Sequence, residues 1–316
     1  MTPFSVVPST HRQTLLGITL AVLAAIGFSG KAILVKLAYQ QGVDAVSLLA
    51  LRMVFSVPLF MAAALWSRTQ KHAYRIQKRD WGAIVALGLI GYYLSSLLDF
   101  VGLAYISASL ERLVLFLYPT LVVILSAWWF KRTLLRHETI ALAVSYVGIV
   151  LVFLQDTSTV QNRIVLGTVL IFGCTLTYSI YLIAAEPLIA RIGSIRFTAY
   201  AMLVASAATI LQFACTHPIA TIQQSARIYA LSIAMALFST VLPVFMLSAG
   251  IRLIGSGQVA LIGSVGPVST LAMAHLFLGE TISGLQCFGS LLVLAGVLLI
   301  SIKSARKDSE CKSKTY

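Results

Sequence analysis

Ten long apolar runs, separated by short polar connections, dominate this sequence of 316 residues. A membrane-spanning helix needs about 20 mostly apolar residues, and most of the runs have that length. Only 10% of the residues are charged, against about 25% in a soluble domain. The chain therefore cannot build a soluble surface, and we expect an all-α integral membrane protein of ten transmembrane helices. The runs are 15–38, 45–66, 81–103, 107–130, 138–154, 164–186, 196–214, 228–249, 256–278 and 282–302.

The basic residues indicate the orientation, because cytoplasmic loops of membrane proteins carry an excess of Lys and Arg. With the N-terminus in the cytoplasm, the tails and the cytoplasmic loops hold 17 of the 23 basic residues, and the opposite loops hold only Arg163 and Arg227. We therefore predict a multi-pass protein of the cytoplasmic (inner) membrane with both termini in the cytoplasm. A cleaved signal peptide is a competing interpretation of the first run, but this run exceeds the usual apolar core of about 7–15 residues.

The two halves of the chain align with each other. Residues 102–152 match residues 250–300 without gaps, at an offset of 148, and pair Pro119 with Pro267. Each half holds five helices, an odd number, so the second half enters the membrane from the side opposite to the first. This arrangement predicts two inverted five-helix repeats around a central cavity. The predicted organisation is a cytoplasmic tail (1–14), a first repeat (15–154), a second repeat (164–302) and a basic cytoplasmic tail (303–316).

A motif near the end of the second repeat carries a family resemblance. The sequence LGET at 278–281 follows a helix that contains Pro267 and precedes Gln286, Gly289 and Gly296. This pattern resembles the EamA family of the drug/metabolite transporter superfamily. The resemblance implies ten helices that enclose a cavity and transport of small metabolites, often outward, without naming the cargo. The first half departs from the motif, because Lys131 and Arg132 stand where the second half has Gly279 and Glu280.

Charged residues interrupt the apolar runs of the first half. An ionisable group at mid-membrane costs about 2.5–3.5 kcal/mol on insertion scales, so such groups generally face a cavity or a partner. In the predicted topology all of them lie on the outward side, and the second half is mostly apolar at the equivalent positions. A symmetric scaffold with asymmetric charge suits a site for one asymmetric solute. The residues are Lys31, Lys36, Arg52, Asp99, Glu111 and Arg112, and their equivalents are Tyr181, Glu186, Met202, Leu247, Val259 and Ala260.

Polar residues at helical spacing extend this candidate site. Tyr92, Ser95, Ser96 and Asp99 form a stripe on the third predicted helix. Proline removes a helical hydrogen bond, so two prolines should kink or interrupt their helices. The predicted substrate-binding residues are Lys31, Arg52, Tyr92, Ser96, Tyr118, Tyr178 and Tyr181; the proton-coupling candidates are Asp99 and Glu111; the predicted kinks are at Pro119 and Pro267.

A structural role remains an alternative for these charged residues. Asp99, Glu111 and Arg52 can form ion pairs that hold helices together. We expect Lys36 to reach the lipid headgroups, Arg112 to be structural, and Glu280 to cap a helix.

The sequence contains no P-loop, no dinucleotide-binding turn, no metal-ligand spacing and no paired catalytic signature. We therefore predict a secondary transporter, with no enzymatic activity, cofactor or metal. Lys31, Arg52 and Arg112 outnumber the two carboxylates, which favours an anionic or zwitterionic solute such as an amino acid or an organic acid. The predicted partners are this small-molecule substrate, membrane lipids and protons as the candidate coupling ion, with no nucleic acid, in a monomer or homodimer. The alternative is a non-transporting scaffold or lipid-handling subunit, whose polar stripes would face partner proteins.

Overall fold

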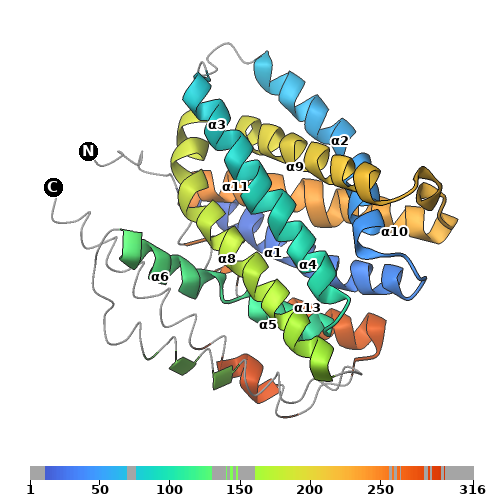
Figure 1. Ribbon diagram of the computed structural model, residues 1–316. Coiled ribbons are helices and arrows are strands. Elements are labelled where there is room, and N and C mark those ends of the chain that lie inside the picture. The colour runs from blue at the N-terminus through green and yellow to red at the C-terminus, as the bar shows by residue number, and fades with distance from the viewer. Residues whose placement is uncertain are drawn as a thin grey trace.

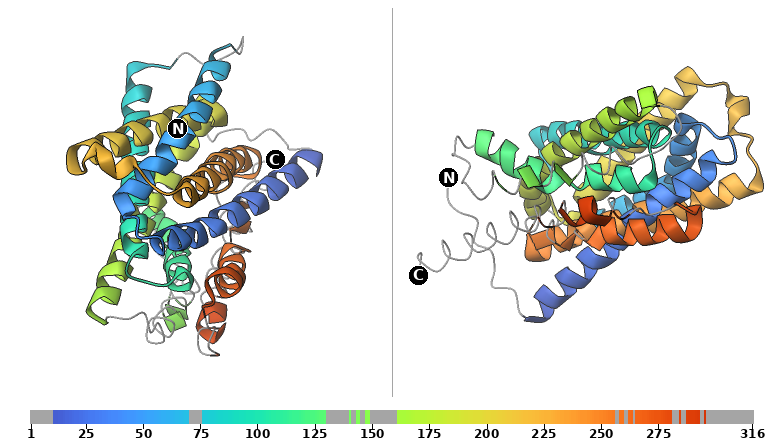
Figure 2. Two further views of the ribbon diagram at one scale, coloured as in Figure 1. Left: turned by 90° about the vertical axis from the view of Figure 1, so that its right-hand side faces the viewer. Right: turned by 90° about the horizontal axis from the view of Figure 1, so that it is seen from below.

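A computed structural model describes residues 11–69, 76–129 and 161–255, most of 258–280, and short segments within 140–148 and 284–295. Every regular element in this described part is a helix, and no strand occurs in it (Figures 1 and 2). The fifth and tenth predicted runs, 138–154 and 282–302, lie mostly outside the described residues.

Six helices of the described part are long and apolar enough to cross a membrane, as a multi-pass protein requires. They are α1 (His11–Tyr39), α2 (Ala45–Arg68), the continuous helix α3–η1–α4 (Lys78–Leu87, Gly88–Leu94 and Ser95–Leu103), α8 (Gln161–Ile192), α9 (Ser194–Thr216) and the continuous helix α10–η3–α11 (Ala226–Ala236, Leu237–Val241 and Leu242–Ile254). The shorter helices are α5 (Ala108–Leu115), α6 (Tyr118–Trp129), η2 (Ile219–Ile222), α13 (Val265–Met273) and η4 (Ala274–Leu278).

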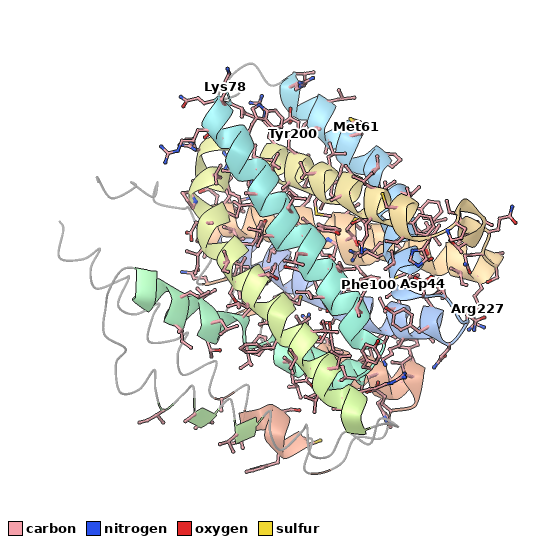
Figure 3. The ribbon with its side chains drawn as sticks, viewed as in Figure 1. Asp44, Met61, Lys78, Phe100, Tyr200 and Arg227 are labelled. Carbon is pink, nitrogen blue, oxygen red and sulfur yellow. The ribbon has the colours of Figure 1, made fainter. Side chains whose placement is uncertain are left out.

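Charged residues mark the two ends of the bundle. Lys78 lies at one end and Asp44 and Arg227 lie at the other (Figure 3). At the Lys78 end, Arg191 donates a hydrogen bond to the buried carboxylate of Asp80, which ties α8 to α3. Polar groups therefore flank the apolar spans, as a bilayer requires.

The two halves of the chain interlock. α1 packs along α11, α4 packs along α8, and α2 packs on α9. At an offset of about 150 residues, α1, α2 and α4 correspond to α8, α9 and α11. The contact of α1 with α11 therefore corresponds to the contact of α8 with α4, and the contact of α2 with α9 corresponds to itself. A twofold relation between the halves predicts this correspondence.

Departures from α-helical geometry recur at equivalent positions in the two halves. The segments η1 and η3 are both π-helical, and they overlap at the offset of 148 residues. In the first half, α5 ends at Leu115 and α6 begins at Tyr118, just ahead of Pro119. In the second half, a turn at Gly263 precedes Pro267. Because proline lacks an N–H group, the carbonyl four residues earlier has no helical donor.

Two buried serines bind backbone carbonyls beside these interruptions. Ser29 Oγ lies 2.9 Å from the carbonyl oxygen of Gly266, and Ser179 Oγ lies 3.2 Å from that of Tyr118. Each hydroxyl shares its one proton between this carbonyl and the carbonyl four residues earlier in its own helix. Gly266 and Tyr118 each precede a proline, and the two serines align at an offset of 150 residues. Each half thus supports the interrupted helix of the other half with the same interaction.

The close crossing of η1 and α9 gives a first prediction. A Cβ atom on Gly88 would lie 2.7 Å from the carbonyl oxygen of Ala201, whereas a Cβ on Gly82 would meet nothing within 4 Å. Overpacking of this kind costs about 1–3 kcal/mol, so Gly88→Ala should lower the melting temperature of the detergent-purified protein. Gly82→Ala, in the same helix, is the control, and equal melting temperatures for both variants would contradict the crossing.

Candidate functional site

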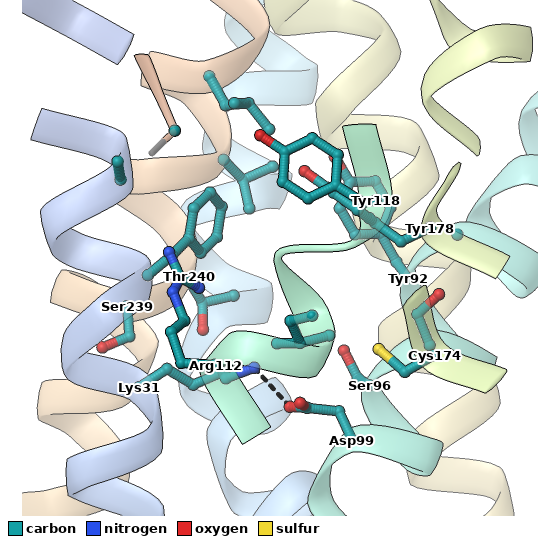
Figure 4. A pocket seen from close by; sticks show the side chains of 18 of the residues that line it. Lys31, Tyr92, Ser96, Asp99, Arg112, Tyr118, Cys174, Tyr178, Ser239 and Thr240 are labelled. Atoms are coloured by element: carbon teal, nitrogen blue, oxygen red, sulfur yellow. Dashed lines mark hydrogen bonds and ion pairs between the residues drawn. The ribbon is translucent and has the colours of Figure 1, made fainter. Parts of the chain in front are cut away.

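A cavity of about 150 Å³ lies inside the bundle, between helices of both halves (Figure 4). Four irregular segments contribute to its wall: Tyr92 from η1, Thr240 from η3, and Leu115 and Gly263 from the two interruptions. Irregular backbone at membrane depth is tolerated where it lines a cavity. The fold therefore places several irregular helical segments around one internal space.

A buried charge cluster forms one end of this cavity. The ammonium group of Lys31 on α1 lies 2.5 Å from Oδ2 of Asp99 on α4 and 3.2 Å from Oε1 of Glu111 on α5. The Lys31 side chain is 13% exposed, and those of Asp99 and Glu111 are 2% and 0% exposed. Such charges are tolerated in an apolar environment only when they are paired. In the described part of the chain, no group of three or more His, Cys, Asp or Glu side chains is placed to hold a metal ion.

Two arginines also line the cavity, and neither has an ion-pair partner among the described residues. The guanidinium carbon of Arg52 lies 4.6 Å from the centre of the Phe100 ring, a cation–π contact. A Cβ on Gly266 would lie 2.1 Å from Nη2 of Arg112, so this guanidinium rests directly against the backbone of α13. Together with Lys31, three cations face two carboxylates, and the cavity has a net positive charge.

Tyrosine side chains form the wall farthest from Asp99 (Figure 4). The rings of Tyr118 and Tyr178 meet edge to face, with centroids 5.7 Å apart. The hydroxyl of Tyr92 lies 2.7 Å from that of Tyr181, whose side chain is fully buried behind the wall. The cavity thus offers aromatic faces together with charged groups.

Most of the predicted site residues meet at this cavity. Its lining includes Lys31, Arg52, Tyr92, Ser96, Asp99, Tyr118 and Tyr178. Glu111 and Tyr181 are not part of the lining and contact it through Lys31 and Tyr92.

Arg112, for which a structural role was expected, also lines the cavity. The missing side chain of Gly266 leaves room for its guanidinium. Ser239 and Thr240 of η3 line the cavity as well, and they are not among the predicted site residues. Ser239 and Thr240 align with Gly91 and Tyr92 in the internal repeat, and this alignment with a predicted site residue could have identified them.

The lining changes from polar to apolar between equivalent positions of the two halves. Three polar residues of the first half align with three apolar residues of the second half, and all of them line the cavity: Asp99 with Leu247, Ser96 with Val244, and Arg52 with Met202. The two halves thus contribute different chemistry to the cavity at aligned positions. A solute with a charged head and an apolar part matches such a surface.

Glu280 fastens the two halves together near the charge cluster. Its carboxylate accepts hydrogen bonds from the backbone N–H of Ala108 at 3.1 Å and from the hydroxyl of Ser109 at 2.6 Å. Glu280 therefore caps the N-terminus of α5, as expected of a helix cap, although the capped helix belongs to the other half. α13 packs against α5 at the same place.

This cap predicts coupled effects on stability. Hydrogen bonds to charged groups contribute about 1.5–3 kcal/mol, so Glu280→Gln and Ser109→Ala should each lower the free energy of unfolding. The double variant should lose less than the sum of the two single losses, because both act on one interaction. Thermal unfolding of the four proteins measures this coupling, and strictly additive losses would contradict it.

The chain has clear relatives. Residues 15–154 and 165–302 each match the EamA-like transporter family. A Bacillus subtilis protein, "Uncharacterized transporter YcbK", is 29% identical over 309 residues, which cover 95% of this chain and 98% of the relative. "Uncharacterized transporter sll1319" of Synechocystis is 24% identical over 91% of this chain and 93% of its own length. A protein of known crystal structure is 19% identical, with a TM-score of 0.66 over 93% of this chain and 97% of that protein, and shares the fold.

Proposed function

The chain belongs to the EamA-like transporter family, and we propose that it is a secondary transporter that exports a small polar metabolite across the cytoplasmic membrane by alternating access. The substrate class we propose is an amino acid or an organic anion. The observation that carries the proposal is the internal cavity, into which Arg52 and Arg112 project without ion-pair partners among the described residues.

The proposed architecture is ten helices in two inverted repeats, with both termini in the cytoplasm. The family matches each half of the chain separately. The equivalent π-helical segments and the reciprocal bonds from Ser29 and Ser179 support a twofold relation. In this topology the Glu280 contact belongs to the extracellular end of the protein and would break when the cavity opens to that side.

A non-transporting scaffold remains the alternative function. It predicts polar stripes on the surface that faces partner proteins. In the described part of the chain, the polar stripe of Tyr92, Ser96 and Asp99 lines the internal cavity instead. This placement supports a site for a small solute.

A ligand screen tests the proposed function. A ligand that binds only the folded protein raises its melting temperature by mass action, so amino acids or organic anions should stabilise the purified protein. Arg52→Gln and Arg112→Gln should each weaken binding of the hit about tenfold or more, since a hydrogen-bonded charge contributes about 1.5–3 kcal/mol.

The matched control for these variants is Arg252→Gln, because Arg252 lies exposed at the end of α11. Its affinity for the hit should equal that of the unmodified protein. Stabilisation only by neutral sugars or hydrophobic cations, or equal binding by all the variants, would contradict the proposed substrate class.

We further propose that Asp99 and Glu111 couple transport to protons. Both carboxylates share one ammonium group, so protonation of one of them leaves the remaining pair neutral. In proteoliposomes, a pH gradient should drive accumulation of the identified substrate, and Glu111→Gln should abolish this drive while exchange of substrate across the membrane continues. Gradient-driven accumulation by the Glu111→Gln variant would exclude this residue from coupling.

A further inference from the structure

We propose that Asp99 and Glu111 form a binding subsite for the primary ammonium group of a zwitterionic substrate, and that Lys31 occupies this subsite in the structure. The inference rests on the proposed transporter function and narrows its substrate class from amino acids or organic anions to solutes that carry both an amine and a carboxylate.

The acceptor atoms of the subsite carry the argument. Asp99 and Glu111 are almost fully buried, yet Oδ1 of Asp99 and Oε2 of Glu111 have no hydrogen-bond partner in the described part of the protein. A primary ammonium group has three donors; Lys31 donates one hydrogen bond to Oδ2 of Asp99 and meets Oε1 of Glu111 only as an ion pair at 3.2 Å. Each of the two carboxylates therefore keeps an unused acceptor oxygen beside a single ammonium group.

The local charge balance leaves room for a second cation at the cluster. Lys31 provides one positive charge for the two carboxylates within 4 Å of it, so these three groups alone have one carboxylate in excess. Arg52 and Arg112 make the cavity as a whole positive, but neither forms an ion pair with Asp99 or Glu111 in the described part of the protein. A ligand ammonium that binds at the cluster compensates the local excess. A purely anionic ligand would instead add a third carboxylate to the cluster.

Partner exchange explains why a zwitterion fits better than a simple amine. When the ligand ammonium binds Asp99 and Glu111, the ammonium of Lys31 is released into the same cavity, which Arg112 also lines. The carboxylate of a zwitterion can pair with Lys31 and Arg112. Lys31, Arg112, Asp99 and Glu111 then each face an opposite charge, which is the condition for burying charged groups.

Chemical rescue tests the subsite. Lys31→Ala removes the resident ammonium and leaves space for a small one, so the variant should have a lower melting temperature than the unmodified protein. Ethylammonium chloride should raise the melting temperature of Lys31→Ala at least twice as much as that of the unmodified protein. Sodium chloride at equal ionic strength and ethanol, the neutral analogue, should not reproduce the rise.

Two variants serve as controls for this rescue. Lys36→Ala removes a lysine from the same helix but outside the cluster, and Lys31→Met/Asp99→Asn/Glu111→Gln removes every charge of the cluster. Neither should respond to ethylammonium more than the unmodified protein does. An equal response of Lys31→Ala and the unmodified protein would overturn the subsite.

A second experiment needs no variant and therefore does not depend on folding of Lys31→Ala. The twenty common amino acids and their N-acetyl derivatives are compared as stabilisers of the unmodified protein. At least one amino acid should raise the melting temperature, and its N-acetyl derivative, which keeps the carboxylate but lacks the ammonium, should bind at least tenfold more weakly. Equal binding of the N-acetyl derivative would overturn the amine subsite and leave an anion transporter, whereas binding by neither group would overturn both.

Discussion

The ion cluster of Lys31, Asp99 and Glu111 is the interaction on which the rest of the structure depends. Three charges from three helices meet inside the bundle, where a buried charge without a partner is costly. Their pairing fixes the relative positions of α1, α4 and α5 at one end of the cavity. Because the cluster leaves carboxylate oxygens unpartnered, it is also the part of the fold best suited to respond to a ligand or a proton.

Around this cluster, aligned segments of the two halves share backbone features but carry different side chains. The pair of π-helical segments, the pair of interruptions ahead of proline, and the reciprocal serine bonds repeat in both halves. The π-helical segments η1 and η3 and both interruptions border the cavity. The side chains at equivalent positions differ, as Asp99 and Leu247 do. These differences give the cavity one charged end.

Hydropathy and the internal repeat predicted the helical membrane fold, because apolar runs of helix length leave few alternatives. Because a charge within an apolar helix costs free energy, the sequence indicated a site at Lys31, Arg52 and Asp99, and these residues line the cavity. The contact of Arg112 with Gly266 could not be predicted, because it depends on the space that Gly266 leaves on a helix far away in the sequence. The π-helical geometry was also inaccessible, since it changes hydrogen bonding without a distinctive sequence. Thr240 became recognisable only through its alignment with Tyr92.

The most direct test of the central claim is a structure of the protein with a bound amino acid that stabilises it, determined in a lipid nanodisc. We expect ligand density inside the cavity, with the carboxylate beside Arg112, the ammonium between Asp99 and Glu111, and Lys31 moved away from Asp99. Density elsewhere on the protein, with the pair of Lys31 and Asp99 intact, would contradict the claim that this charged cavity is the substrate site.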